Sequence, residues 1–312
     1  MSPSAPPSFF DDSSADIVLR SCSGKDFRVY KTILSRASPV FEGMFTLPVP
    51  PPSAVPPEEY SNGLHVVTLT ESSEALDALL RFCYPVREPS LSSIEKTLEV
   101  FHAAKKYDID EGIMWAREKL AGFAAKEPIR VYALACRYGW EEEARIAAKE
   151  TLSMSLDTLL CSKSKELADI SAFDLQRLCM YHISCRKAIS HLTTPRFIIE
   201  GSWRPWEPLW SREPCSCSHS VIKTKTYVES DVLPYYAKSW WCEYMEELKK
   251  ALDTVPSKTS TTQPRALAAA VVKASACSSC AADALESLMA CAEQLSSKVD
   301  AEIEKVQLQF VQ

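Results

Sequence analysis

The spacing of apolar residues changes from a strand-like to a helix-like period within the first 125 residues of this chain, and this change limits the folds that it can adopt. Short β-branched runs of alternating polarity, such as residues 16–21, indicate strands. Later segments, such as residues 94–107, place apolar residues three and four positions apart, which is typical of helices with one buried face. The order is two strands, two helices, a strand, then three helices. It predicts an α+β unit in which a small sheet packs against helices.

Local signals indicate where several of these elements begin. Residues 23–26 form a turn between the first two strands. Ser38 is expected to cap the second helix, because its hydroxyl can accept a free amide of the first turn and Pro39 suits the first helical position. Strands are predicted over residues 16–21, 27–30 and 65–69, and helices over 31–36, 39–45, 73–82, 94–107 and 113–123.

Residues 47–57 hold six prolines in eleven positions. Proline lacks a backbone donor and interrupts helices and central strands. We therefore expect an exposed, extended insert over residues 47–60, between the second helix and the third strand. A ligand for a proline-binding protein is the alternative interpretation.

Four motifs follow one another along the first part of the chain: Ala15–Leu19, Phe27–Phe41, Leu79–Pro85 and Val100–Ile109. In these motifs and in its element order, this part resembles the BTB/POZ domain. The resemblance implies a BTB/POZ fold over residues 15–125, homodimerisation, and recruitment of protein partners, often cullin-type ubiquitin ligase scaffolds. The combination of such a domain with Pro85 after Tyr84 resembles the BTB proteins that are abundant in mushroom-forming fungi.

The resemblance also implies interface residues. In dimeric members, an acidic residue matching Asp16 and a basic residue matching Lys31 form a charged pocket at the dimer interface. Many members have a His-Lys or His-Arg pair where this chain has Tyr30-Lys31, so that pair is only half kept. The alternative interpretation is a partly solvated ion pair between Asp16 and Lys31, worth under ~1 kcal/mol.

The remainder is expected to be a mainly α-helical C-terminal region. Short amphipathic helices over residues 126–194 cannot bury their apolar faces alone, and they resemble the helical extension that packs beneath many BTB domains. Residues 195–312 form a separate region that begins with three tryptophans amid prolines. We interpret these tryptophans as packing anchors, with a peptide-binding surface as the alternative. The individual helices are expected over 128–138, 141–154, 156–167, 173–189, 235–252 and from Pro264 towards Phe310.

Cysteine is the best candidate for chemistry in this region. Zinc prefers four thiolate or imidazole ligands in a tetrahedron, and closely spaced pairs supply them. A structural zinc site of Cys215, Cys217, Cys277 and Cys280, with His219 as an alternate ligand, would join the loop at 215–219 to the last helix. The Cys-x-Cys spacing and the long gap between the pairs argue against zinc. Free thiols and a redox pair are the alternatives, and no thioredoxin-like pattern surrounds Cys277.

Composition argues against several other classes. A formal charge of −6 disfavours binding to nucleic acid or anionic membranes, because both need a basic surface. No run of about 18 apolar residues predicts a membrane-spanning helix. Residues 1–14 are expected to be a disordered tail rather than a signal peptide. Twelve cysteines without a secretory signal favour a reducing intracellular compartment, cytoplasm or nucleus. The cysteines expected to be buried, small apolar residues are Cys83, Cys136, Cys161 and Cys179.

These features predict an adaptor rather than an enzyme. Its N-terminal domain is expected to dimerise or to bind a cullin-type scaffold, while the rest holds a second partner. A transcriptional or chromatin cofactor that dimerises through the BTB domain, without a ligase link, is the first alternative. A zinc or thiol enzyme is the second, although no hydrolase elbow, phosphate-binding glycine loop or His-Glu-x-x-His motif is present.

Overall fold

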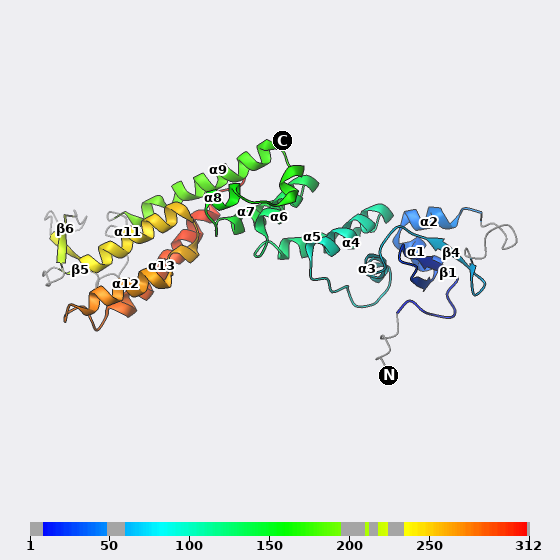
Figure 1. The fold of residues 1–312 in the computed structure, drawn as a ribbon, viewed down its shortest axis with the longest axis horizontal. Coiled ribbons are helices and arrows are strands. Elements are labelled where there is room, and N and C mark those ends of the chain that lie inside the picture. Colours follow the sequence, from blue (N-terminus) through cyan, green and yellow to red (C-terminus); the bar gives the residue numbers. More distant parts are fainter. Residues whose placement is uncertain (1–8, 49–59, 195–209, 212–217, 224–233, 311–312) are drawn as a thin grey trace. The chain divides into compact units, whose positions relative to one another are not determined.

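The computed structural model describes residues 9–48, 60–194, 210–211, 218–223 and 234–310. The chain divides into two compact units, Met1–Phe123 and Ala124–Gln312 (Figure 1), and each is described by itself. Several features predicted from the sequence lie outside the described residues. They are the tail up to residue 8, most of the proline-rich insert, Trp203 and Trp206 of the three tryptophans Trp203, Trp206 and Trp210, and the cysteines Cys215 and Cys217.

The N-terminal unit is an α+β fold, as predicted. Its strands are β1 (Ile17–Arg20), β2 (Asp26–Val29), β3 (Tyr60–Ser61) and β4 (Leu64–Thr68), and its helices are α1 (Lys31–Ala37), α2 (Pro39–Phe45), α3 (Ser73–Cys83), α4 (Ile94–Tyr107) and α5 (Asp110–Gly122). The sheet has the order β2-β1-β4-β3. The central pair β1–β4 is parallel, and the two outer pairs are antiparallel. A parallel pair requires a crossover connection, and α1 and α2 lie within it.

The short strand β3 was not expected from the sequence. Asn62 and Gly63 join it to β4, and both have positive φ, 52° and 81°. An Asn-Gly pair with positive φ at both positions is the favoured two-residue hairpin connection, because its twist matches that of the flanking strands. The hairpin therefore adds one strand at the edge of the sheet, directly after the proline-rich insert.

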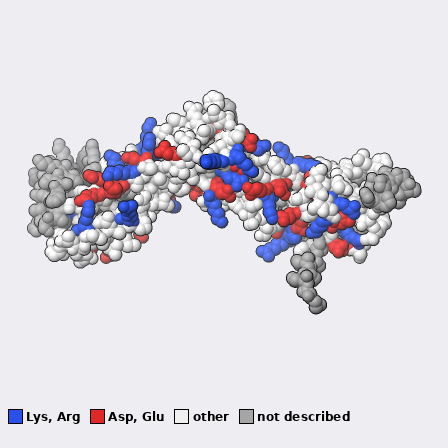
Figure 2. Space-filling model, viewed as in Figure 1, with Lys and Arg blue, Asp and Glu red and all other residues white. Residues whose placement is uncertain are grey.

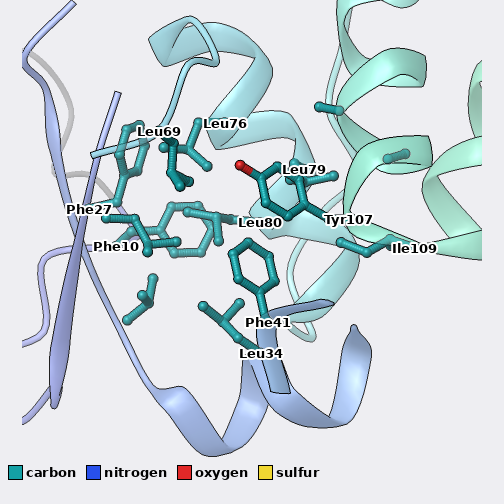
Figure 3. Close-up of a cluster of buried hydrophobic side chains, with 14 of the residues drawn as sticks. Phe10, Phe27, Leu34, Phe41, Leu69, Leu76, Leu79, Leu80, Tyr107 and Ile109 are labelled. Carbon is teal, nitrogen blue, oxygen red and sulfur yellow. The ribbon is translucent and has the colours of Figure 1, made fainter. Parts of the chain in front are cut away.

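The core of this unit is a cluster of buried apolar side chains from strands and helices (Figure 3). The rings of Phe41 and Tyr107 stack in it, with centroids 4.6 Å apart. Ser38 caps α2 as predicted, because its Oγ accepts the Phe41 amide at 3.1 Å. The Ser38 hydroxyl also donates to the backbone carbonyl of Tyr107. The cap thus ties the start of α2 to the end of α4.

The ordered structure begins earlier than the predicted domain start at residue 15. Phe10 is only 2% exposed and lies in the core cluster. Its carbonyl accepts the Arg28 amide at 2.9 Å. Residues 9–14 therefore pack along β2 rather than forming a free tail.

The C-terminal unit is mainly helical, as predicted, but it also contains a small sheet. The strands pair antiparallel in the order β5-β7-β6. Gly139 ends α6 in the left-handed conformation, with φ of 72°, as expected for a helix stop. The elements are α6 (Pro128–Tyr138), α7 (Glu141–Thr151), α8 (Leu156–Leu160), η3 (Lys165–Asp169), α9 (Ala172–Ile189), η4 (Ser190–Thr193), β5 (Trp210–Ser211), β6 (Ser218–Lys223), β7 (Pro234–Lys238), α11 (Ser239–Thr254), η6 (Lys258–Ser260), α12 (Pro264–Ser275) and α13 (Ala284–Glu304).

Four helix predictions in this unit were wrong in their extent. The helix expected over 141–154 stops at Thr151. The helix expected from residue 235 begins at Ser239, because residues 234–238 pair with β6 as a strand. The long helix expected from Pro264 is interrupted by turns over residues 276–283, where the polar Cys-Ser-Ser-Cys run is a weak helix former. The helix expected over 156–167 stops at Leu160, and a short 3-10 helix follows.

Candidate functional site

Asp16 and Lys31, the predicted interface residues, lie together where β1 and α1 begin. A carboxylate oxygen of Asp16 accepts the backbone amide of Lys31 at 2.8 Å. Lys31 is the first residue of α1, and a helix N-terminus carries unpaired amides and a positive partial charge. The neighbouring cap residue, Tyr30, provides no side-chain cap. Asp16 therefore caps α1 from another element, while remaining exposed.

A second carboxylate, which was not predicted from the sequence, lies beside this pair. The Tyr30 hydroxyl donates to Asp12 at 2.6 Å, and the Ser14 amide donates to the other carboxylate oxygen at 2.9 Å. These hydrogen bonds lower the pKa of Asp12 to about 2, so it is anionic at neutral pH. Hydrogen bonding to Asp12, with a smaller effect from the charge of Asp16, raises the pKa of Tyr30. Two carboxylates, Asp12 and Asp16, thus accompany a protonated tyrosine on one exposed edge.

An open groove of about 670 Å³ runs beside α3 in the N-terminal unit. Arg81 pairs with Asp77 at 2.6 Å, and Lys96 pairs with Glu74 at 2.6 Å. Arg81 also donates to the backbone carbonyl of Arg87 at 3.1 Å, which holds the segment after α3 against the helix. A groove with both signs of charge can complement a protein partner better than a polyanion. The other residues that line it are Lys25, Ser73, Ala78, Glu88, Pro89, Ser90 and Leu91.

The residues of the predicted zinc site are only partly described. Cys277 and Cys280 are both buried, 4% and 5% exposed, on the turn between α12 and α13. The Cys280 amide donates to the Cys277 carbonyl at 3.0 Å, so the two lie on one turn of chain. His219, expected in a loop, belongs to strand β6. Among the described residues, no group of three zinc-type ligands comes together. Two buried thiols on one turn have the right donor chemistry, and the full site stays a prediction.

Several other cysteines are poorly suited to thiol chemistry. Burial raises the pKa of the Cys83 thiol to about 12 and that of Cys136 to about 11. Burial also raises the pKa of the Cys185 thiol to about 11 and that of the Cys291 thiol to about 12. Thiolates, not thiols, are the nucleophiles, so burial disfavours the reactive form of these four side chains at neutral pH. Cys161 was expected to be buried but is exposed at the end of α8.

The charged residues on the face drawn in Figure 2 alternate in sign across its described part. Nucleic-acid surfaces are marked by a stripe or patch of basic residues, and this face does not present one. Within the described ranges, no helix combines the length and the apolar character needed to cross a bilayer.

The groove and the Asp12–Asp16 edge both belong to the part of the chain that resembles a known family. Residues 8–121 match the family model of the BTB/POZ domain, a span that contains β1 to β4 and nearly all of α5. A comparison with curated proteins found no match for the chain. The matched span coincides with the N-terminal compact unit and its mixed sheet. Residues 8–121 are therefore a BTB/POZ domain, and the chain is a BTB/POZ domain-containing protein.

Proposed function

We propose that this protein is an adaptor that recruits a cullin-type ubiquitin ligase scaffold through its BTB/POZ domain and holds a second partner through its C-terminal unit. The observation that carries the proposal is the family match over residues 8–121, since a BTB/POZ domain is a protein-interaction module. The match covers a compact unit with its own core, as an independent binding domain requires.

The groove beside α3 supports a protein as the ligand of this domain. Its volume, about 670 Å³, and its open shape suit a macromolecular surface rather than an enclosed small molecule. Its charges are largely paired within the domain, Arg81 with Asp77 and Lys96 with Glu74. Such pairs present fixed donors and acceptors of both signs, which favour specificity for a complementary protein surface.

Light scattering on a sizing column tests this proposal. The full chain would be mixed with the amino-terminal region of a cullin at micromolar concentration. The expected result is a new species that contains both proteins and is heavier than either protein measured alone. A chain that elutes alone, whether as a monomer or a dimer, would contradict the cullin link and favour the transcriptional or chromatin cofactor instead.

We also propose that Asp16 and Lys31 contribute to a homodimer interface. The Asp16 carboxylate is exposed although it caps α1, so one of its oxygens stays available to a second copy of the chain. The D16N variant separates these two roles, because the amide oxygen of asparagine can still accept the Lys31 amide while the charge is lost. If the charge contributes to the interface, the dissociation constant of the D16N dimer should be about tenfold higher than that of the wild-type dimer. This change corresponds to about 1.4 kcal/mol of dimerisation free energy.

The matched control for this experiment is D11N. Asp11 is also acidic and exposed, and its carboxylate lies 3.7 Å from Arg28 in the same unit. The D11N substitution should leave the dissociation constant of the dimer unchanged. Equal dimerisation of D16N and the wild type would exclude Asp16 from the interface.

A further inference from the structure

The segment that follows α13 lies against two other helices of the C-terminal unit. α13 packs beside α9 (Figure 1), and it ends at Glu304. Residues 306–310 then continue without regular structure. Leu308 is only 3% exposed, so this segment is seated on the unit rather than projecting from it.

Phe310 is held by two cationic side chains from different helices. The guanidinium carbon of Arg145, on α7, lies 5.1 Å from the centroid of the Phe310 ring. That of Arg177, on α9, lies 4.4 Å from it. A guanidinium group over an aromatic ring is attracted by the negative face of the ring. The two arginines therefore form a receptor for an aromatic side chain.

This receptor is positioned by its own helices and not by Phe310. Arg145 is paired with Glu141 at 3.0 Å and with Glu142 at 2.5 Å, all on α7. Arg177 is paired with Asp174 at 2.6 Å on α9. Because these carboxylates fix both guanidinium groups, the site should persist when the segment leaves it. Preorganisation of this kind favours binding of an external ligand.

The segment itself is attached through side chains. Across the described residues, the backbone groups of residues 307–310 form no hydrogen bond with another element. The attachment includes buried Leu308, the Phe310 ring and an ion pair between Lys149 and Glu304 at the helix end. Segments with few buried contacts and no backbone pairing open at low free-energy cost. The segment can therefore exchange with a competitor.

We propose that α7 and α9 form a peptide-binding site that takes an extended partner segment with an apolar residue two positions before an aromatic one, and that Leu308 and Phe310 occupy it in cis. Residues two apart on an extended chain point to the same side, which explains why Leu308 and Phe310 are both engaged while Gln309 between them is exposed. The site uses only the C-terminal unit, so it stands or falls independently of the BTB/POZ partner.

Fluorescence anisotropy of a labelled peptide tests the proposal on the full chain. The peptide spans residues 304–310 and has blocked ends. In the double variant L308S/F310A the cis segment is released, and the peptide should bind. In the wild type the cis segment acts at a millimolar effective concentration, so a peptide of about 10 μM affinity should bind about a hundredfold more weakly.

Two controls identify the residues responsible. The Q309A variant changes an exposed residue between the two anchors, and it should remain as closed as the wild type. Adding R145Q and R177Q to the double variant should reduce peptide affinity by about tenfold or more, because both cation–π contacts are lost. A peptide with serine and alanine in place of its leucine and phenylalanine should not bind.

The proposal is overturned if the released variant keeps its helical circular dichroism but does not bind the peptide, or binds the altered peptide equally well. If the double substitution lowers the helical content, the single variant F310A is measured in the same assay. It leaves Leu308 in place, and binding above the wild-type level is expected. No gain in a folded F310A protein would show that the segment is only a structural clamp.

Discussion

His182 is a buried histidine in the C-terminal unit, 3% exposed on α9. Its Nε2 lies 2.9 Å from the hydroxyl oxygen of Thr151, whose proton is directed to the Ala148 carbonyl at 2.6 Å. The threonine oxygen is therefore the acceptor, and Nε2 carries the proton of the neutral imidazole. Burial lowers the pKa of His182 to about 4.

This histidine should make the C-terminal unit sensitive to acid. Below about pH 6.5 the unfolded chain binds a proton that the folded chain does not bind until about pH 4. The contribution of the neutral His182 imidazole to the free energy of unfolding is therefore complete above pH 6.5 and is lost as the pH falls to about 4. The loss is on the order of 3 kcal/mol. Urea unfolding of the wild type and H182Q, followed by circular dichroism, measures it.

The informative quantity is the difference in unfolding free energy between wild type and H182Q. It should shrink by roughly 3 kcal/mol between pH 7 and pH 4, because titration of the carboxylates is common to both proteins. A difference that stays constant with pH would show that His182 is not kept neutral by the fold.

At the scale of elements, α4 and α5 approach each other closely at Gly112. A Cβ added there would lie 2.8 Å from the Cβ of Ala104 and 3.2 Å from the ring of Phe82. G112A should therefore destabilise the N-terminal unit by about 1–3 kcal/mol, as overpacking does. Unfolding by heat or urea measures the change.

Gly122, at the end of the same helix, is the matched control. A Cβ added there meets nothing within 4 Å. G122A should be neutral or stabilising by up to about 1 kcal/mol, since alanine is the better helix former. Equal stability of G112A and G122A would mean that the helices separate easily at Gly112.

The sequence predicted the elements that depend on local patterns. The β1–β2 hairpin, the Ser38 cap and the Gly139 stop follow from neighbouring residues, and the structure confirms all three. Strand β7 was missed because Tyr235 and Tyr236 also fit the helical spacing of the residues after them. Those tyrosines form a strand because Ile222 and Val221 of β6 pair with them, a distant contact that no local pattern shows.

The candidate sites were predictable only where a family resemblance reached them. The prediction that Asp16 and Lys31 are interface residues came from that resemblance. The groove beside α3 combines Lys25 with residues 73–96, which are far apart in sequence. Asp12 lay in the expected tail, and only its contacts with Tyr30 and Ser14 identify it. Asn62-Gly63, in contrast, is a hairpin signal that the sequence contained.

At the scale of the whole molecule, the zinc hypothesis concerns how distant parts of the C-terminal unit are joined. If Cys277 and Cys280 bind zinc with Cys215 and Cys217, the purified full chain should contain about one zinc per molecule. Mass spectrometry of the metal content measures this. The C277S/C280S variant should lose the zinc, whereas C161S, at an exposed cysteine, should keep it. Wild-type protein without zinc, or a double variant that retains it, would contradict the hypothesis.

Our main proposal is that this molecule recruits a cullin-type scaffold through residues 8–121, its BTB/POZ domain. Hydrogen–deuterium exchange of the full chain, measured with and without the amino-terminal region of a cullin, would locate the binding surface. Slower exchange is expected within residues 9–123, concentrated along α3 and the segment after it that line the groove. Unchanged exchange throughout this unit, or protection confined to residues 124–310, would contradict the proposal.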